Sequence, residues 1–192
     1  MFEIFLLSII QGITEFIPVS SSSHLILISS FVNFDHKSLS IDVSLHIGSL
    51  LAVITYFSKD LISFTKNREL LLKIFIASIP VIIVGYILIK TNYIENLRSI
   101  KIIGWTTLLF GILLYISDRF KLKKDIDNNF SFKACVVIGL FQILSLIPGV
   151  SRSGITITAA RALAFKRYDA SKISFLLSIP TLGAVSIFGI RN

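Results

Sequence analysis

Residues 11–24, Q-G-I-T-E-F-I-P-V-S-S-S-S-H, are the stretch that decides how the chain folds. They interrupt an apolar N-terminus with a carboxylate, a proline, four consecutive serines and a histidine. Residues 142–156, Q-I-L-S-L-I-P-G-V-S-R-S-G-I-T, repeat the glutamine, the proline and the serines in the same order. The pair indicates a chain that folds twice in a similar way and brings two polar segments together.

The composition is that of an integral membrane protein. Of the 192 residues 54% are hydrophobic and 16% are charged, whereas about a quarter of the residues of a soluble domain are charged. The net charge is +8, but Lys and Arg gather in short loops, where they suit anionic lipid and topology signals better than nucleic acid. The single cysteine, Cys135, lies in an apolar run and indicates neither a disulfide framework nor a metal cluster.

Apolar runs divide the chain into long and short segments. Those around 72–89, 102–117 and 173–190 approach the roughly 20 residues that a membrane-spanning helix needs, and 43–57 does so with its flanks. Four shorter runs flank the polar segments in pairs, at 2–13, 24–34, 134–150 and 155–165. Since non-helical backbone at membrane depth must line protein or a water-filled cavity, each pair is predicted to be a re-entrant helix–loop–helix segment.

The internal repeat predicts the architecture. Gln11 corresponds to Gln142, and Pro18 corresponds to Pro148. We expect a single integral membrane domain over residues 1–192, an all-α polytopic helical bundle with inverted repeats. The first repeat would cover about 1–125 and a partial second about 131–192. Counterparts of the 72–89 and 102–117 spans would then be missing, so the bundle is expected to be shortened at its C-terminus.

Charge in the loops predicts the topology. The connections 58–73 and 118–133 are the most basic, and two spans separate them, so both should face one side. The positive-inside rule makes that side cytoplasmic. The first ten residues hold no Lys or Arg, which argues against a cleaved signal peptide.

The first polar segment places a carboxylate at membrane depth. Gln11 and Glu15 are four residues apart, so a helix would put them on one face. Pro18 would end that helix, and any of the serines 20–23 could cap the next one, which would start near His24. The plainer alternative is a capped helix with a snorkelling Glu15. Intramembrane ionisable groups are functional by default, which favours a site.

The second polar segment is suited to bind an anion. Gly149 frees the backbone, and residues 151–154, Ser-Arg-Ser-Gly, are predicted to form a turn with inward amides. A helix over 155–165 would add its positive end. The Arg152 guanidinium offers a planar fork for phosphate oxygens, and Thr156 adds a hydroxyl on the same face. The plainer alternative is that the Arg152 side chain snorkels from a helix end to the membrane surface. We interpret Arg161 differently, as an interfacial anchor.

These groups together suit phosphoryl transfer. Arg152 would clamp a phosphate, a serine from 20–23 would attack, and Glu15 or His24 would act as base. A hard cation such as Mg²⁺ or Ca²⁺ could bridge Glu15 and the phosphate oxygens. For His46 two roles stay open, a hydrogen bond within the bundle or a place in the site.

The motifs resemble the undecaprenyl pyrophosphate phosphatase family, also called bacitracin-resistance proteins. The resemblance rests on residues 11–25 and 148–156, supported by I-D-V-S-L-H-I-G-S-L-L-A-V at 41–53 and F-L-L-S-I-P at 175–180. It implies a multi-pass enzyme of the bacterial inner membrane whose site opens toward the periplasm. Such an enzyme hydrolyses undecaprenyl diphosphate to the monophosphate and inorganic phosphate, which recycles the lipid carrier for peptidoglycan synthesis and confers bacitracin resistance.

The resemblance also implies the site residues. It places Gln11 and Glu15 in the E/Q-x-x-x-E motif, Ser21 as candidate nucleophile, His24 as the motif histidine and Arg152 as the phosphate-binding arginine. The remaining phosphate-binding residues would be Ser151, Ser153, Gly154 and Thr156. A divalent cation would be required, with Glu15 as its ligand.

Two departures from the family pattern bear on these expectations. Ser22 and Ser23 stand where the family usually has Thr-Gly, so the turn is expected to differ. The shortened C-terminus leaves three further readings: a reduced form, an inactive truncated member, and a half completed by homo-oligomerisation. The alternative from another class is an inverted-repeat transporter of an anion or a lipid phosphate. The expected partners are a polyprenyl diphosphate and membrane lipids, without nucleic acid.

Overall fold

Helices make up most of the computed structural model, which describes residues 2–32, 39–63, 68–91, 99–120 and 123–190. In these ranges the only β-structure is an isolated bridge between Lys124 and Phe165. The elements are α1 (Phe2–Thr14), α2 (Ser21–Val32), α3 (Leu39–Tyr56), α4 (Ser58–Ser63), α5 (Arg68–Lys90), α7 (Ile100–Asp118), α8 (Ile126–Asn129), α9 (Phe132–Gln142), the 3₁₀ helix η1 (Ile143–Leu146), α10 (Arg152–Ala162) and α11 (Arg167–Ile190).

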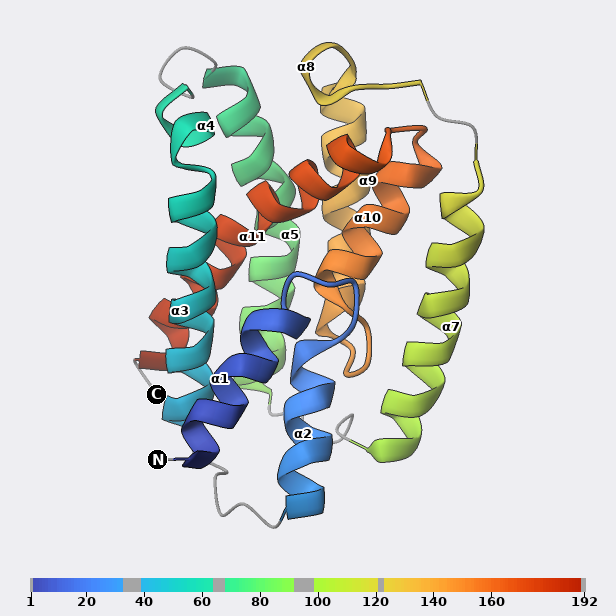
Figure 1. Cartoon of the computed structure of the whole chain (residues 1–192). Helices are drawn as coiled ribbons and strands as arrows, with labels where there is room; N and C mark the ends of the chain where they lie inside the picture. Colours follow the sequence, from blue (N-terminus) through green and yellow to red (C-terminus); the bar gives the residue numbers. More distant parts are fainter. Residues whose placement is uncertain (1, 33–38, 64–67, 92–98, 121–122, 191–192) are drawn as a thin grey trace.

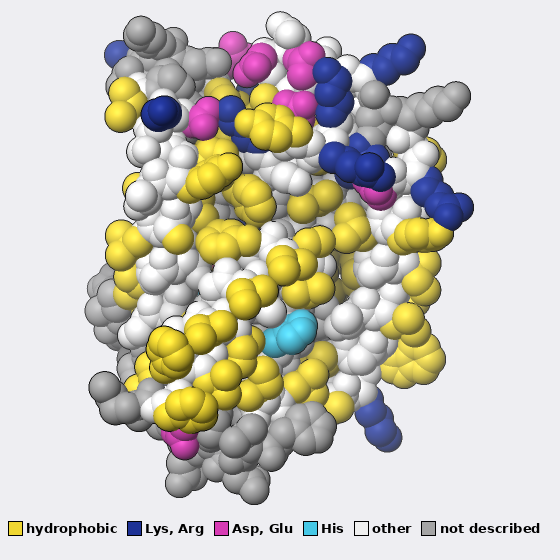
Figure 2. All heavy atoms as spheres, viewed as in Figure 1, with side chains coloured by type: hydrophobic (Ala, Val, Ile, Leu, Met, Phe, Trp, Pro, Cys, Tyr) yellow, Lys and Arg dark blue, Asp and Glu magenta, His cyan; other side chains and the backbone are white. Residues whose placement is uncertain are grey.

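Three of these helices are long and apolar enough to cross a membrane, namely Arg68–Lys90, Ile100–Asp118 and Arg167–Gly189. They cover the three long runs expected from the sequence, whereas the fourth expected span, in α3, is a shorter apolar helix. Apolar side chains cover the middle of the visible surface, and most of the charged ones gather at one end (Figure 2). The described chain is therefore an all-α polytopic membrane protein, as predicted.

The two polar segments form helical hairpins that point in opposite directions. The α1–α2 hairpin enters from the end of the molecule that holds both termini, and the α9–α10 hairpin enters from the other end (Figure 1). Their tips meet near the middle of the bundle. The arrangement supports the inverted repeat and the re-entrant segments, which remain predictions.

The boundaries of the first hairpin differ slightly from the expected ones. Helix α1 ends at Thr14, and helical main-chain bonds continue to Ile17, just before Pro18. Helix α2 begins at Ser21, because the amide of Ser23 donates to the Ser20 hydroxyl. Ser23 thus lies within the helix, and the positive φ angles of the described backbone occur at Gly149 and Ala164. The backbone at position 23 therefore does not need a glycine, and the expected difference from the turn of the family stays a prediction.

The second hairpin corrects the predicted helix start. Residues 151–154 are not a turn: Ser151 caps α10, its hydroxyl accepting from the Gly154 amide, and the helix starts at Arg152. The turn comes earlier, where the Val150 amide donates to the Ile147 carbonyl. Pro148 and Gly149 occupy its centre, and Gly149 has a φ of +95°. This is the pattern of a type II turn, with proline second and glycine third.

The core lies between α5, α9, α10 and α11. Ile138, Ile173, Leu176 and Leu177 are fully buried. Helix α10 consists mostly of Ser, Gly, Thr and Ala, and small residues let helices approach closely in a membrane protein. Arg161 is buried in this core and paired with Asp118 of α7, so the prediction of an interfacial anchor was wrong.

The two basic connections lie at one end of the bundle, as expected. Helix α4, between α3 and α5, and helix α8, between α7 and α9, both lie toward the top of the view (Figure 1). The assignment of that end to the cytoplasm stays a prediction.

Candidate functional site

The Glu15 carboxylate is the centre of the site. It follows the last residue of α1 and is 7% exposed. Its Oε1 accepts from Arg152 Nη2 at 2.7 Å, and its Oε2 accepts from the Ser21 hydroxyl at 2.6 Å and from Gln11 Nε2 at 3.0 Å. A buried carboxylate needs such partners, because an unpaired charge in this environment is very unfavourable.

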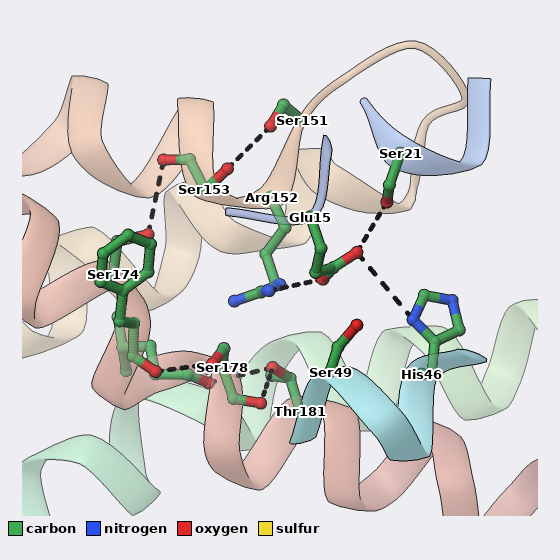
Figure 3. Close-up of polar contacts among 12 residues, drawn as sticks. Glu15, Ser21, His46, Ser49, Ser151, Arg152, Ser153, Ser174, Ser178 and Thr181 are labelled. Atoms are coloured by element: carbon green, nitrogen blue, oxygen red, sulfur yellow. Dashed lines mark hydrogen bonds and ion pairs between the residues drawn. The ribbon is translucent and has the colours of Figure 1, made fainter. Parts of the chain in front are cut away.

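An ion pair between Glu15 and Arg152 joins the two hairpins across 137 residues of sequence (Figure 3). Arg152 is the first residue of α10, so the cap at Ser151 sets where its side chain leaves the helix. The hairpins also touch directly, since the Ser153 hydroxyl donates to the Ile17 carbonyl at 3.2 Å. The prediction that the two motifs form halves of one cluster agrees with this geometry.

Gln11 fixes the carboxylate from behind. Its amide nitrogen donates to Glu15 and approaches His46 Nδ1 at 3.2 Å. Because the Glu15 carboxylate can only accept, the Gln11 amide presents its nitrogen to it, and the same nitrogen can donate to His46 Nδ1 in the tautomer that has its proton on Nε2. His46 Nδ1 is also 4.0 Å from Glu15 Oε2. Of the two roles left open for His46, the structure supports the one in the site.

The serines of the first hairpin divide into two groups. Ser21 faces the carboxylate, which is the arrangement of a nucleophile with its base. Ser20 and Ser23 instead bond to one another at 2.8 Å, and both are buried. The structure therefore distinguishes Ser21 from its neighbours, which the run of four serines does not.

His24 lies apart from the ion pair. Its Nδ1 is 2.7 Å from the Ser20 carbonyl, so Nδ1 carries a proton and donates. The recorded contacts of this residue within the described chain do not include Glu15, Ser21 or Arg152. In this arrangement Glu15 rather than His24 is the group in position to act as base.

The expected phosphate-binding residues of α10 are only partly at the site. Ser151 and Ser153 lie together, with their hydroxyls 3.0 Å apart, and Gly154 uses its amide for the cap. Thr156 points instead to α11, where its hydroxyl meets that of Ser174 at 2.7 Å. Thr156 thus packs α10 against α11 and does not contact the ion pair.

Two buried polar atoms in the site have no protein partner among the described residues. They are Arg152 Nη1 and Gln11 Oε1. The first belongs to the Arg152 guanidinium, whose other terminal nitrogen, Nη2, already pairs with Glu15. Arg152 therefore has one donor group engaged with the protein and one that remains available to an anion.

A family described as "Bacitracin resistance protein BacA" matches residues 4–191. The chain belongs to this family.

Two relatives of the chain in the BacA family carry the same name. The chain is 52% identical to the "Undecaprenyl-diphosphatase" of Pelagibacter ubique, over 99% of this chain and 75% of the relative. It is 43% identical to the "Undecaprenyl-diphosphatase" of Jannaschia sp., over 98% of this chain and 75% of the relative. The resemblance inferred from the two motifs is thus confirmed.

The BacA-family site does not by itself fit a divalent cation. All three donors around Glu15 already occupy its two oxygens, and one of them is a cation, Arg152. Within the described ranges, no group of three or more His, Cys, Asp or Glu side chains lies close enough to hold a metal. Mg²⁺ is usually held by one or two carboxylates together with waters and substrate phosphates, so these residues alone would supply only part of its ligands.

Proposed function

We propose that the protein hydrolyses undecaprenyl diphosphate to undecaprenyl phosphate and inorganic phosphate, as the name of its relatives implies. The hydroxyl of Ser21, the carboxylate of Glu15 and the guanidinium of Arg152 form a continuous chain of contacts, and this observation carries the proposal. Phosphoryl transfer needs an anion clamp, a nucleophile and a base, and these three residues supply one each.

Binding would use the available side of Arg152. Nη1 has no protein partner and is buried, so a phosphate oxygen that reaches it replaces no existing hydrogen bond. Nη2 can meanwhile stay on Glu15 Oε1. The guanidinium would then connect the base with the terminal phosphate, and a charged donor in a buried site stabilises the transition state strongly.

The chemical step would start at Ser21. Its oxygen attacks the terminal phosphorus, its proton passes to Glu15 Oε2, and the bond between that phosphorus and the bridging oxygen breaks. Undecaprenyl phosphate leaves, and the proton on Glu15 goes to solvent. Water then attacks the phosphoserine and gives a proton to Glu15, which passes it to the Ser21 oxygen as the bond from that oxygen to phosphorus breaks and inorganic phosphate leaves. The sum consumes one water per diphosphate.

Metal dependence remains a prediction of the family resemblance, with Mg²⁺ or Ca²⁺ as the ion. The proposed reaction uses only residues of the chain, because Gln11, Ser21 and Arg152 already donate to the two oxygens of Glu15. Diphosphate oxygens of the substrate could bring their own ion. Assays with and without chelator test this point directly.

We also propose the cellular setting that the family implies. The protein would lie in the bacterial inner membrane with its site toward the periplasm, where it would return the lipid carrier to peptidoglycan synthesis. The mixed basic and acidic end that holds α4 and α8 would face the cytoplasm under the positive-inside rule (Figure 2). Cysteine labelling at Ser58 and at Ser22 from either side of the membrane would test this orientation.

Phosphate release from a polyprenyl diphosphate by the purified chain in liposomes tests the activity. We expect release that depends on Ser21, with Ser21→Ala lowering turnover by roughly a thousandfold or more. Ser22→Ala is the matched control, since Ser22 is exposed and next in sequence. Folded protein without release would refute the hydrolase, and lipid flux without release would favour a transporter. Substantial turnover by Ser21→Ala would instead favour direct attack by water.

A further inference from the structure

We infer that Thr106 and Thr107 of α7 are positioning residues that hold the turn before Arg152 in its working conformation. The expected effect on turnover rests on the proposed function. The expected effect on the conformation of the turn rests on the structure alone. Neither threonine lies in the motifs that define the site. Both lie on α7, and only 11% of the apolar stretch of this helix is buried inside the protein.

Two hydroxyls of α7 reach the carbonyls at the centre of the turn. Thr106 Oγ1 is 2.7 Å from the Pro148 carbonyl oxygen, and Thr107 Oγ1 is 3.2 Å from that of Gly149. The Ile147 carbonyl, at the start of the turn, accepts from the Val150 amide. The α7 hydroxyls therefore satisfy the two carbonyls that the turn itself does not use.

The single proton of the Thr106 hydroxyl has to choose between acceptors. The hydroxyl also lies 2.8 Å from the Ile102 carbonyl within α7. That carbonyl already accepts the main-chain bond of the helix, in which each amide donates four residues back. Pro148 is half-buried, and no main-chain amide of the described residues donates to its carbonyl, so a bond from Thr106 to Pro148 is more favourable than a second bond to Ile102.

The contact with Pro148 selects one orientation of the peptide between Pro148 and Gly149. Type I and type II turns differ by rotation of this central peptide, and the type II form puts the third residue at positive φ. A donor from α7 holds the Pro148 carbonyl toward that helix, which keeps Gly149 at +95°. The path of the chain into Ser151 and Arg152 depends on this orientation.

The turn and α7 also fit closely. A Cβ atom at Gly149 would overlap the Thr106 hydroxyl and would lie 2.7 Å from the Ile103 carbonyl. At its other end α7 is tied to the same helical unit, because Asp118 pairs with Arg161 of α10 at 2.9 Å. About 18 Å of helix separates Thr106 from Asp118. Helix α7 thus holds α10 at both ends, and the threonines act on the end that carries Arg152.

The test replaces one hydroxyl by a methyl group of the same shape. Thr106→Val should lower kcat for phosphate release about tenfold to a hundredfold and change KM less than about threefold, since a misplaced guanidinium weakens transition-state binding most. Thr106→Ser should restore turnover. Thr55→Val is the control, because the Thr55 hydroxyl bonds only to the Leu51 carbonyl of its own helix, at 2.7 Å, in the recorded contacts.

Amide hydrogen exchange reports on the turn itself, whatever the activity. Exchange at Val150 should rise about tenfold in Thr106→Val and stay unchanged in Thr55→Val. If wild type releases no phosphate, the proposed function fails and this measurement still decides the inference. Turnover within twofold of wild type together with unchanged exchange at Val150 would overturn it. Should Thr106→Val not fold, Thr107→Val is subject to the same criteria.

Discussion

The two hairpins share a sequence pattern but differ in what surrounds them. Helix α10 packs against α7, α9 and α11, and most of its residues are buried. Helix α2, in contrast, packs mainly against α1 in the described chain. The first hairpin brings the carboxylate and Ser21; the second brings the guanidinium. The two hairpins therefore contribute different groups to the site, and only the second is packed on three sides by other helices.

The two equivalent glutamines show this inequality most clearly. Gln11 contacts Glu15 four residues later and His46 of α3. The residue four after Gln142 is Leu146, and I-D-V-S at 41–44 aligns with Y-D-A-S at 168–171, which sets Ile173 opposite His46. Gln142 is fully buried, and neither polar atom of its side chain has a partner in the described chain. The second polar segment thus contains the matching glutamine without the neighbours that Gln11 has.

Among the variants that compare the two hairpins, those that break the link between them have the largest expected effect. Arg152→Lys should lower turnover by about a hundredfold or more, since an ammonium cannot hold Glu15 and a phosphate oxygen with two separate nitrogens. Arg167→Lys is the control, because that exposed arginine pairs with Asp118 at the other end of α10. Phosphate release measures both variants, and near wild-type turnover by Arg152→Lys would show that the clamp is assigned wrongly.

A matched pair of substitutions tests the two glutamines against each other. Gln11→Leu should lower turnover roughly tenfold, because Glu15 loses a donor that fixes its position. Gln142→Leu should leave turnover unchanged and raise the free energy of unfolding by about 1–3 kcal/mol, because it removes a buried polar group without partners. Thermal melts in detergent and phosphate release check the pair. Loss of stability in Gln142→Leu would mean that its amide has a partner, such as water.

The smallest expected effect concerns the end of α10. Ala164 has a φ of 74°, and the amides of Ala164 and Phe165 donate to the carbonyls of Arg161 and Ala160. This is a Schellman motif, in which glycine is preferred at the left-handed position. Ala164→Gly should raise the free energy of unfolding by about 1 kcal/mol.

Ala162→Gly, two residues earlier, is the control for the end of α10. Ala162 is the last residue of the helix, where glycine should lower stability by up to about 1 kcal/mol. Thermal melts compare the two variants. Equal destabilisation by both would contradict the role assigned to the positive φ angle.

The sequence predicted the chemistry of the site better than its local geometry. Gln11, Glu15, Ser21 and Arg152 were expected to act together, and the structure brings them together. Thr156 and His24 share the motifs but point elsewhere. Motif spacing fixes which residues are near one another along a helix, but not which face of that helix meets the partner hairpin.

The sequence alone determined that this is a helical membrane protein with two unequal halves, because hydrophobic run length and the repeated Q…P…S pattern are local properties of the chain. It could not identify Thr106 and Thr107, whose partners lie 42 residues away in sequence. Without the family resemblance it could not choose among the four serines, and it could not place His46 either. Those choices depend on how helices rotate and pack against one another, and buried polar groups then select the packing that satisfies them.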